Sequence, residues 1–265
     1  ALDPEGTTVI PILLRHLEAP QAIRDGHSRR LVEYLGAYGP RAAAAVPVLT
    51  RLLEENEPTG AGVHFAAVVA LGRIGPAAAP AVPAMHARAE ARTFAEACGR
   101  IGPGATRAVP ALQGLARKNG ATEARYAVEA LGRIGPGAAP AVPDLIDLVQ
   151  DTHPRNDAAG AAVAALGRIG PAAKDAVPLL RKIADTQPET SRGPGPFGAA
   201  VALARIDPEA LELTAALEAA VVKSGASGRH RAGLPAPEGA TRRNGTAPRE
   251  FTNQDAVALL RDAGL

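Results

Sequence analysis

The amino-acid sequence predicts an all-α protein, an α-solenoid in which about six helical hairpins stack in a row. Two observations support this fold class: a recurring segment and a recurring pair of prolines. The segment LGRIGPGAAPAVP, at residues 131–143, returns with small edits at 71–83 and 166–178 and more loosely at 35–47 and 98–110. A unit that cannot bury its own apolar face must stack on neighbours, and tandem copies supply those neighbours.

The paired prolines fix the period of the repeat. In each close copy the two prolines are seven residues apart, as in Pro136 and Pro143. The first prolines of the pairs, with Asp207-Pro208 as the last anchor, stand at 4, 40, 76, 103, 136, 171 and 208. The spacings between them are 36, 36, 27, 33, 35 and 37 residues. Spacings of this length accommodate two helices and two turns, so each unit is predicted to be one hairpin.

The first helix of a unit is predicted over residues 121–133. Its apolar residues recur at three- and four-residue steps, which indicates an amphipathic helix with a stripe of small side chains. Gly132 and Gly135 stand at its end, where we expect the chain to leave the helix through a left-handed conformation. Pro136 then prevents the helix from continuing.

The second helix is predicted over residues 141–151, with Pro143 in its first turn, where a missing N–H costs nothing. The 27-residue spacing is an exception to the regular length. No Gly, Pro or Asn lies between residues 84 and 98 to make a turn. Either the second helix of that unit has only two turns, with a tight reversal near residues 90–92, or the two helices partly fuse, and we expect the short reversal.

Composition constrains the core and the partners. Apolar residues make up 46% of the chain but aromatic residues only 3%, with no Trp, so Ala, Leu, Val and Ile are expected to fill the core. Cys98 takes a position that other copies fill with Leu, and we interpret it as a small core residue. With no apolar run near 18 residues, no membrane span is expected. Localisation stays undetermined, with the cytoplasm favoured slightly over the periplasm.

Three regions are predicted along the chain: the solenoid at 1–223, a disordered basic linker at 224–250, and a short helix at 251–265. The linker holds five Arg against two Glu, whereas the net charge of the whole chain is only +2. The linker therefore carries +3 and the remainder −1, so the solenoid as a whole has no strong field of one sign. The start of the chain inside a repeat suggests a module of a larger protein.

The unit AVEALGRIG followed by AVPDLI, at residues 127–135 and 141–146, resembles the HEAT repeat in its bacterial form, the phycocyanobilin-lyase HEAT-like repeat. The similarity covers about residues 1–223. It implies a right-handed superhelix of paired helices, similar to armadillo proteins, in which one helix of each pair lines a concave surface that commonly binds other proteins. The extra proline-rich turn, such as Pro76 to Pro80, departs from the family pattern.

Enzymes of similar build leave marks that can be sought in the sequence. Deoxyhypusine hydroxylase, which resembles this architecture, holds iron through His-Glu pairs. None of the six histidines is followed by Glu: His16, His27, His64, His86, His153 and His230. We expect no cofactor and no metal. An enzyme or enzyme subunit of the bilin-lyase kind stays as an alternative, and so does nucleic-acid binding through the arginines between Arg229 and Arg249.

Arginines occur in two registers. The first register closes the first helices and comprises Arg73, Arg100, Arg133, Arg168 and Arg205. These residues are either a row of anion-binding groups or cations that satisfy the last helical carbonyls and the helix dipole. The second register opens the first helices, at Arg29, Arg92 and Arg125. We expect its members to pair with carboxylates of the adjacent unit.

The outward face of the second helices is the predicted binding surface, and we expect it to be the concave one. Its residues carry mixed charges, which suit a protein or peptide rather than a phosphate backbone. The candidate residues are Thr50, Arg51, Glu54, His86, Gln113, Arg117, Asp147, Gln150, Arg181 and Lys182. The sequence therefore predicts a monomeric, non-catalytic scaffold that binds a protein or peptide along this face.

Overall fold

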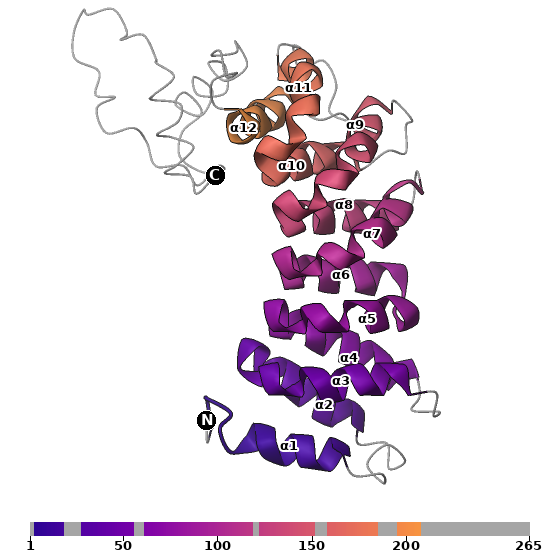
Figure 1. Cartoon of the computed structure of the whole chain (residues 1–265), viewed down its shortest axis with the longest axis vertical. Coiled ribbons are helices and arrows are strands. Elements are labelled where there is room, and N and C mark those ends of the chain that lie inside the picture. The colour runs from indigo at the N-terminus through magenta and orange to yellow at the C-terminus, as the bar shows by residue number, and fades with distance from the viewer. Residues whose placement is uncertain are drawn as a thin grey trace, which may run out of the picture.

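A computed structural model describes residues 3–18, 28–55, 61–118, 122–151, 158–184 and 195–207. Within these ranges every regular element is helical, and the helices stack into an elongated array with α1 at one end and α12 at the other (Figure 1). The structure thus confirms the all-α solenoid. Five complete hairpins run from α2 to α11, and a single helix flanks them at each end of the described stack.

Each unit has two helices and a connecting turn. The first helices are α2 (Ser28–Ala37), α4 (Ala61–Ile74), α6 (Ala91–Ile101), α8 (Thr122–Ile134), α10 (Ala159–Ile169) and α12 (Pro196–Ile206). The second helices are α1 (Val9–Glu18), α3 (Val46–Glu54), α5 (Val82–Arg88), α7 (Val109–Ala116), α9 (Val142–Gln150) and α11 (Val177–Ala184). The connecting turns are η1 (Gly39–Ala45), η2 (Gly75–Ala81), η3 (Gly102–Ala108), η4 (Gly135–Ala141) and η5 (Gly170–Ala176).

The connecting turn explains the constant spacing of the prolines. In every hairpin it spans seven residues of 3₁₀ structure, which a non-helical residue interrupts in η1, η3 and η5, and a proline stands at the start of both the turn and the helix that follows. In the best-predicted unit Pro136 opens η4 and Pro143 opens α9. Both positions suit a residue without an N–H, since the first N–H groups of a helix lack partners inside it.

The glycine that opens each turn has a backbone conformation that side chains disfavour. Gly102 has φ 68° and ψ −134°, and Gly170 has φ 73° and ψ −142°. Gly135 also has a positive φ, of 73°. The positive φ agrees with the prediction, but the ψ of Gly102 and Gly170 lies outside the left-handed helical region, near a region that is essentially reserved for glycine. The chain therefore turns sharply at this residue.

The prediction that Gly132 helps to end the helix is wrong. Gly132 lies inside α8, and a Cβ added to it would lie 2.9 Å from the Cα atom of Ala165 in α10. Gly72 and Gly167 face Ala97 and Ala202 of the next first helix in the same way. These glycines let successive first helices approach closely, so their role is packing between units.

The core has the predicted composition. Buried Ala, Val, Leu and Ile side chains of all described helices form one continuous cluster along the stack. Cys98 is completely buried within it, as expected of a core residue. Burial raises the pKa of its thiol to about 12. A thiol in this setting stays protonated near neutral pH and is chemically inert.

The short unit folds as predicted. The helix α5 has only seven residues, and Ala89 and Glu90 are extended, with ψ angles of 146° and 149°. The next helix begins at Ala91. A two-residue reversal therefore replaces the longer loop of other units, which accounts for the 27-residue spacing.

One expectation about apolar runs needs correction. The stretch Gly62–Arg88 has the length and hydropathy of a membrane span. It nevertheless comprises α4, η2 and α5, which fold back on each other as a hairpin, and 61% of its most apolar window is buried in the stack. Its hydropathy reflects the alanine-rich core. The predicted boundaries at residues 223 and 250 lie outside the described residues.

Candidate functional site

The ten candidate residues lie on the second helices or at their ends, and none of them is buried. They do not form one cluster, because they are distributed over five units along the stack. Two subsets each consist of neighbouring residues. One comprises Thr50, Arg51 and Glu54 on α3, and the other comprises Gln113 on α7 and Arg117 directly after it.

An open groove lies beside α3. It has a volume of about 470 Å³ and is lined on one side by η1 and α3 and on the other by Ala77 and Pro80 of η2. Thr50, Arg51 and Glu54 supply the polar part of the lining. The Thr50 hydroxyl donates to the carbonyl of Val46 at 2.7 Å, and the Arg51 Nε atom lies 3.3 Å from Glu55 Oε1. The groove thus combines an apolar surface with charges of both signs.

A second polar group joins two units. Arg117 donates from Nε and from a terminal guanidinium nitrogen to the two carboxylate oxygens of Asp144, at 2.8 and 3.2 Å. Gln113 donates to the same carboxylate at 2.7 Å and to the Pro140 carbonyl at 3.1 Å. Asp144 and Asp147 raise the pKa of Arg117, chiefly because its guanidinium donates a hydrogen bond to Asp144. Gln113 and Arg117 therefore act first as a bridge between α7 and α9.

Sequence analysis missed Asp144, the centre of this bridge. Its side chain is only 12% exposed, against 66% for that of Arg117. The residue follows the second proline, where the other hairpins carry Val48, Ala84, Ala111 and Leu179. Because the other hairpins have an apolar residue at this position, the single acidic residue was the signal that could have revealed Asp144.

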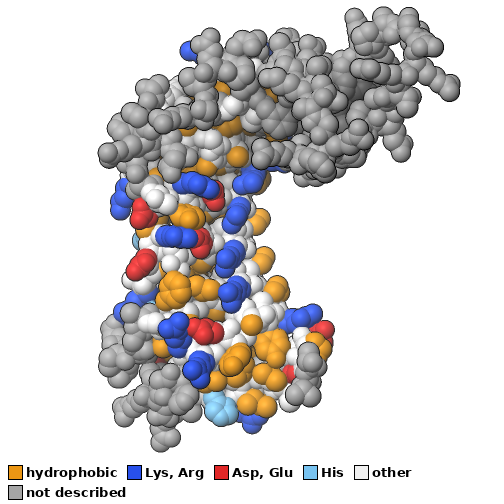
Figure 2. All heavy atoms as spheres, turned by 180° about the vertical axis from the view of Figure 1, so that it is seen from behind, with side chains coloured by type: hydrophobic (Ala, Val, Ile, Leu, Met, Phe, Trp, Pro, Cys, Tyr) orange, Lys and Arg blue, Asp and Glu red, His pale blue; other side chains and the backbone are white. Residues whose placement is uncertain are grey.

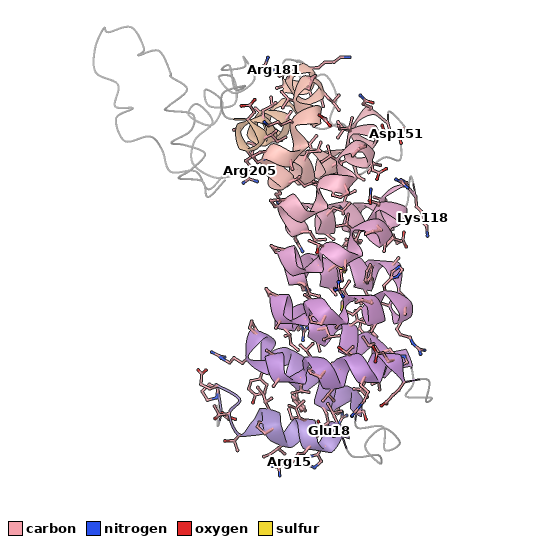
Figure 3. The ribbon with its side chains drawn as sticks, in the orientation of Figure 1. Arg15, Glu18, Lys118, Asp151, Arg181 and Arg205 are labelled. Carbon is pink, nitrogen blue, oxygen red and sulfur yellow. The ribbon has the colours of Figure 1, made fainter. Side chains whose placement is uncertain are left out.

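The remaining candidates are separate from these groups. The ring of His86 on α5 lies 5.0 Å from the ring of Phe94 on α6, centroid to centroid. Asp147 and Gln150 are exposed on α9, and Arg181 and Lys182 are exposed on α11. Arg181 lies at the C-terminal end of the described stack (Figure 3). The candidate residues together are polar and mixed in charge.

The two layers of helices differ in charge. The first helices carry nine arginines and four glutamates, a net charge of +5. The second helices carry five basic and four acidic residues, a net charge of +1. The near-neutral sum for the solenoid therefore conceals a basic layer. Figure 2, the view from behind, shows Lys and Arg side chains in a row along the stack.

The prediction for the second arginine register is wrong. Arg29, Arg92 and Arg125 each pair with a glutamate four residues later in the same helix, at 2.8, 2.9 and 3.0 Å. Residues four apart are neighbours on a helix surface, so a local partner was available. The guanidinium of Arg92 also lies 4.6 Å from the ring centroid of Tyr126 in α8. That cation–π contact links α6 to α8.

No group of three or more His, Cys, Asp or Glu side chains that could hold a metal occurs among the described residues.

Comparisons with known proteins support the repeat architecture. Residues 121–193 match the family model of HEAT repeats. A designed armadillo repeat protein in complex with the peptide (KR)4 has a similar structure, with a TM-score of 0.53 and 16% identity over 76% of this chain and 100% of that chain. An engineered protein from a structural genomics consortium gives a TM-score of 0.48 and 20% identity over 74% of this chain and 96% of that chain. No curated protein matches.

Proposed function

We propose that the chain is a non-catalytic scaffold that binds a protein or peptide along the outward face of its second helices. The observation that carries this proposal is the open groove beside α3, where charges of both signs border an apolar surface. A groove of this kind suits an extended peptide, which offers apolar and polar side chains together. The HEAT-repeat match and the fold shared with an armadillo repeat protein give further support.

The remaining candidates extend the same surface along the stack. Asp147, Gln150, Arg181 and Lys182 lie on later second helices and are exposed, so a partner that passes the groove can also reach them. Gln113 and Arg117 are held by Asp144, and they contribute a fixed rather than an adaptable contact. A side chain that is already held loses little entropy on binding.

The test is a selection from a random peptide-display library on the full chain, followed by affinity measurements on the selected peptides. The surface variant reverses three charges, Arg51→Glu, Asp147→Lys and Arg181→Glu. The control is Glu123→Lys, a charge reversal on the first-helix layer. We expect the surface variant to weaken binding at least about tenfold, since each reversal replaces an attraction by a repulsion, and the control to change it less than about twofold.

Two results would contradict the proposal. One is a selection that yields no peptide with affinity above that for an unrelated protein. The other is a set of peptides that bind the wild type and the surface variant equally well. The nucleic-acid alternative concerns residues 229–249, which lie outside the described residues, and the bilin-lyase alternative gains no support from the described ones.

A further inference from the structure

One arginine closes each first helix from α4 to α12. These five residues, called the arginine file below, are Arg73, Arg100, Arg133, Arg168 and Arg205. They occupy equivalent positions, and the first helices pack directly against one another in sequence, so the five side chains follow one line along the stack. Arg205 marks its C-terminal end (Figure 3), and the file of basic side chains is visible in Figure 2.

The arginine file has no partner among the described residues. No hydrogen bond or ion pair of these five guanidinium groups occurs there, including any to the last carbonyls of their own helices. Glu96 and Glu129 lie four residues before Arg100 and Arg133, but each pairs with the arginine four residues before itself. The helices α6 and α8 thus carry both registers, one paired with glutamate and one without a partner among the described residues.

The side chains of the file are positioned by the unit before them. A Cβ added to Gly99 would lie 3.3 Å from Cδ and 3.5 Å from a terminal nitrogen of Arg133. Gly36 and Gly132 lie under the Cδ atoms of Arg73 and Arg168 in the same way. The aliphatic parts of these arginine side chains therefore pack against glycine backbone, where a larger residue would displace them. Side chains that pack in this way keep their guanidinium groups in water at regular intervals.

A small residue recurs beside each arginine of the file. The residue three before each file arginine is alanine and is buried, at positions 70, 97, 130, 165 and 202. Aromatic residues of the first-helix layer do not share one position of the repeat: Tyr34 on α2 and Phe65 on α4 are exposed, and Tyr126 on α8 lies against Arg92. Proteins that bind single-stranded nucleic acid usually combine charge with aromatic side chains on which successive bases stack, so this surface favours a different anionic ligand.

The spacing suits an extended peptide. Packed helices lie roughly 8–10 Å apart, which sets the interval between file arginines. A polyproline II chain advances about 9.3 Å in three residues, whereas phosphates of a DNA strand follow at about 3.4 Å along the axis. An acidic side chain at every third position of an extended peptide therefore meets one arginine per unit. Five arginines span roughly 35 Å, or about 12 peptide residues.

We propose that the arginine file is a second binding surface, separate from the second-helix face, and that it binds an extended acidic segment of a partner protein through Asp or Glu side chains spaced three residues apart. Arginine suits this task because its planar group binds a carboxylate through two parallel hydrogen bonds. The basic first-helix layer adds a longer-range attraction for such a segment.

The experiment measures binding of a fluorescein-labelled peptide of five Glu-Pro-Pro triplets to the full chain by fluorescence anisotropy at low salt. The file variant is Arg100→Gln, Arg133→Gln and Arg168→Gln together. The matched control is Arg29→Gln, Arg92→Gln and Arg125→Gln, which removes the same charge from the same layer but from the paired register. Circular dichroism shows whether both variants keep the helical content of the wild type.

We expect the file variant to lose at least about tenfold in affinity and the control variant no more than about threefold, since exposed ion pairs contribute modestly one by one and add along a file. A peptide with five contiguous Glu and the same composition should bind more weakly than the triplet peptide. The triple reversal of the second-helix face should leave triplet-peptide binding unchanged, so this proposal can fail independently of the proposed function.

Three outcomes would overturn the proposal. Equal losses in the file and control variants would show attraction by net charge alone. Equal binding of the triplet peptide and its Gln-Pro-Pro counterpart would show that carboxylates play no part. Tighter, file-dependent binding of a labelled oligothymidylate of about 15 nucleotides would assign the surface to nucleic acid instead.

Discussion

At the scale of single residues, identical amino acids do different work according to their neighbours. Arg92 is paired with Glu96 and stacked on Tyr126, whereas Arg100, two turns later in the same helix, has no partner among the described residues. Sequence alone identified both registers but not which one is neutralised. Glu96 has one arginine four residues before it and another four residues after it. Which of the two it pairs with depends on side-chain geometry, which the spacing in the sequence does not determine.

Asp144 should contribute measurably to the stability of the stack. Replacing it with Ala removes the acceptor of three side-chain hydrogen bonds from Gln113 and Arg117. We expect the free energy of unfolding, measured by urea denaturation, to fall by about 1 kcal/mol or more. The loss should be smaller in an Arg117→Ala background, because part of the interaction is already gone.

The control for Asp144 is Asp147→Ala on the same helix, which removes an exposed carboxylate and should change stability by less than about 0.5 kcal/mol. Equal effects of the two substitutions would contradict a structural role for the bridge between α7 and α9.

Cys98 should be unreactive until the stack opens. Burial raises the pKa of its thiol to about 12, so the thiolate that reacts with disulfide reagents is scarce in the folded protein at pH 8 and is also inaccessible. We expect reaction with a chromogenic disulfide reagent to be roughly 100-fold slower in buffer than in denaturing urea. Rapid reaction in buffer would show that α6 is not packed as described.

The same pKa predicts a pH dependence with a definite sign. The thiol has a pKa of about 12 in the folded protein and about 8.5 in the unfolded chain, so the folded state favours the protonated thiol. The contribution of this thiol to the free energy of unfolding is therefore fully present below about pH 8.5 and is lost as pH rises toward 12. The slope of unfolding free energy against pH, measured from pH 8.5 to 10, should be less negative in Cys98→Val. Identical slopes in the two proteins would contradict a buried, protonated thiol.

At the scale of elements, the repeat is held by two kinds of glycine. One kind, such as Gly135, opens the turn with positive φ, and the other, such as Gly132, lets first helices touch. Periodicity and proline spacing predicted the two helices at 121–133 and 141–151 to within one residue at each end. They did not predict the 3₁₀ form of the turn or the packing role of Gly132, because both depend on the neighbouring unit.

The packing role of Gly132 can be tested against a glycine without close neighbours. In Gly132→Ala the new methyl group would lie 2.9 Å from backbone of α10, and we expect a loss of about 1–3 kcal/mol in unfolding free energy. Gly114, within α7, has nothing within 4 Å of an added Cβ, so Gly114→Ala should stabilise by about 0.5–1 kcal/mol. Thermal or urea unfolding measures the change in unfolding free energy of each variant. Changes of the same sign in the two variants would contradict a packing role for Gly132.

At the scale of the whole molecule, the stack presents two faces with different chemistry. The second-helix layer is mixed in charge and has a groove beside α3, whereas the first-helix layer is basic. Summing charge along the sequence could not reveal this division, because the two layers alternate every half unit. The candidate residues lie on the second helices or directly after them, but the helical period could not show that Asp144 immobilises two of them.

The most direct test of the scaffold is hydrogen–deuterium exchange of the full chain, followed by mass spectrometry, with and without a saturating selected peptide. We expect slower exchange in segments that cover α3, α9 and α11, with α4, α8 and α10 unchanged. Protection confined to the first helices, or no protection in any second helix, would contradict binding along the second-helix face.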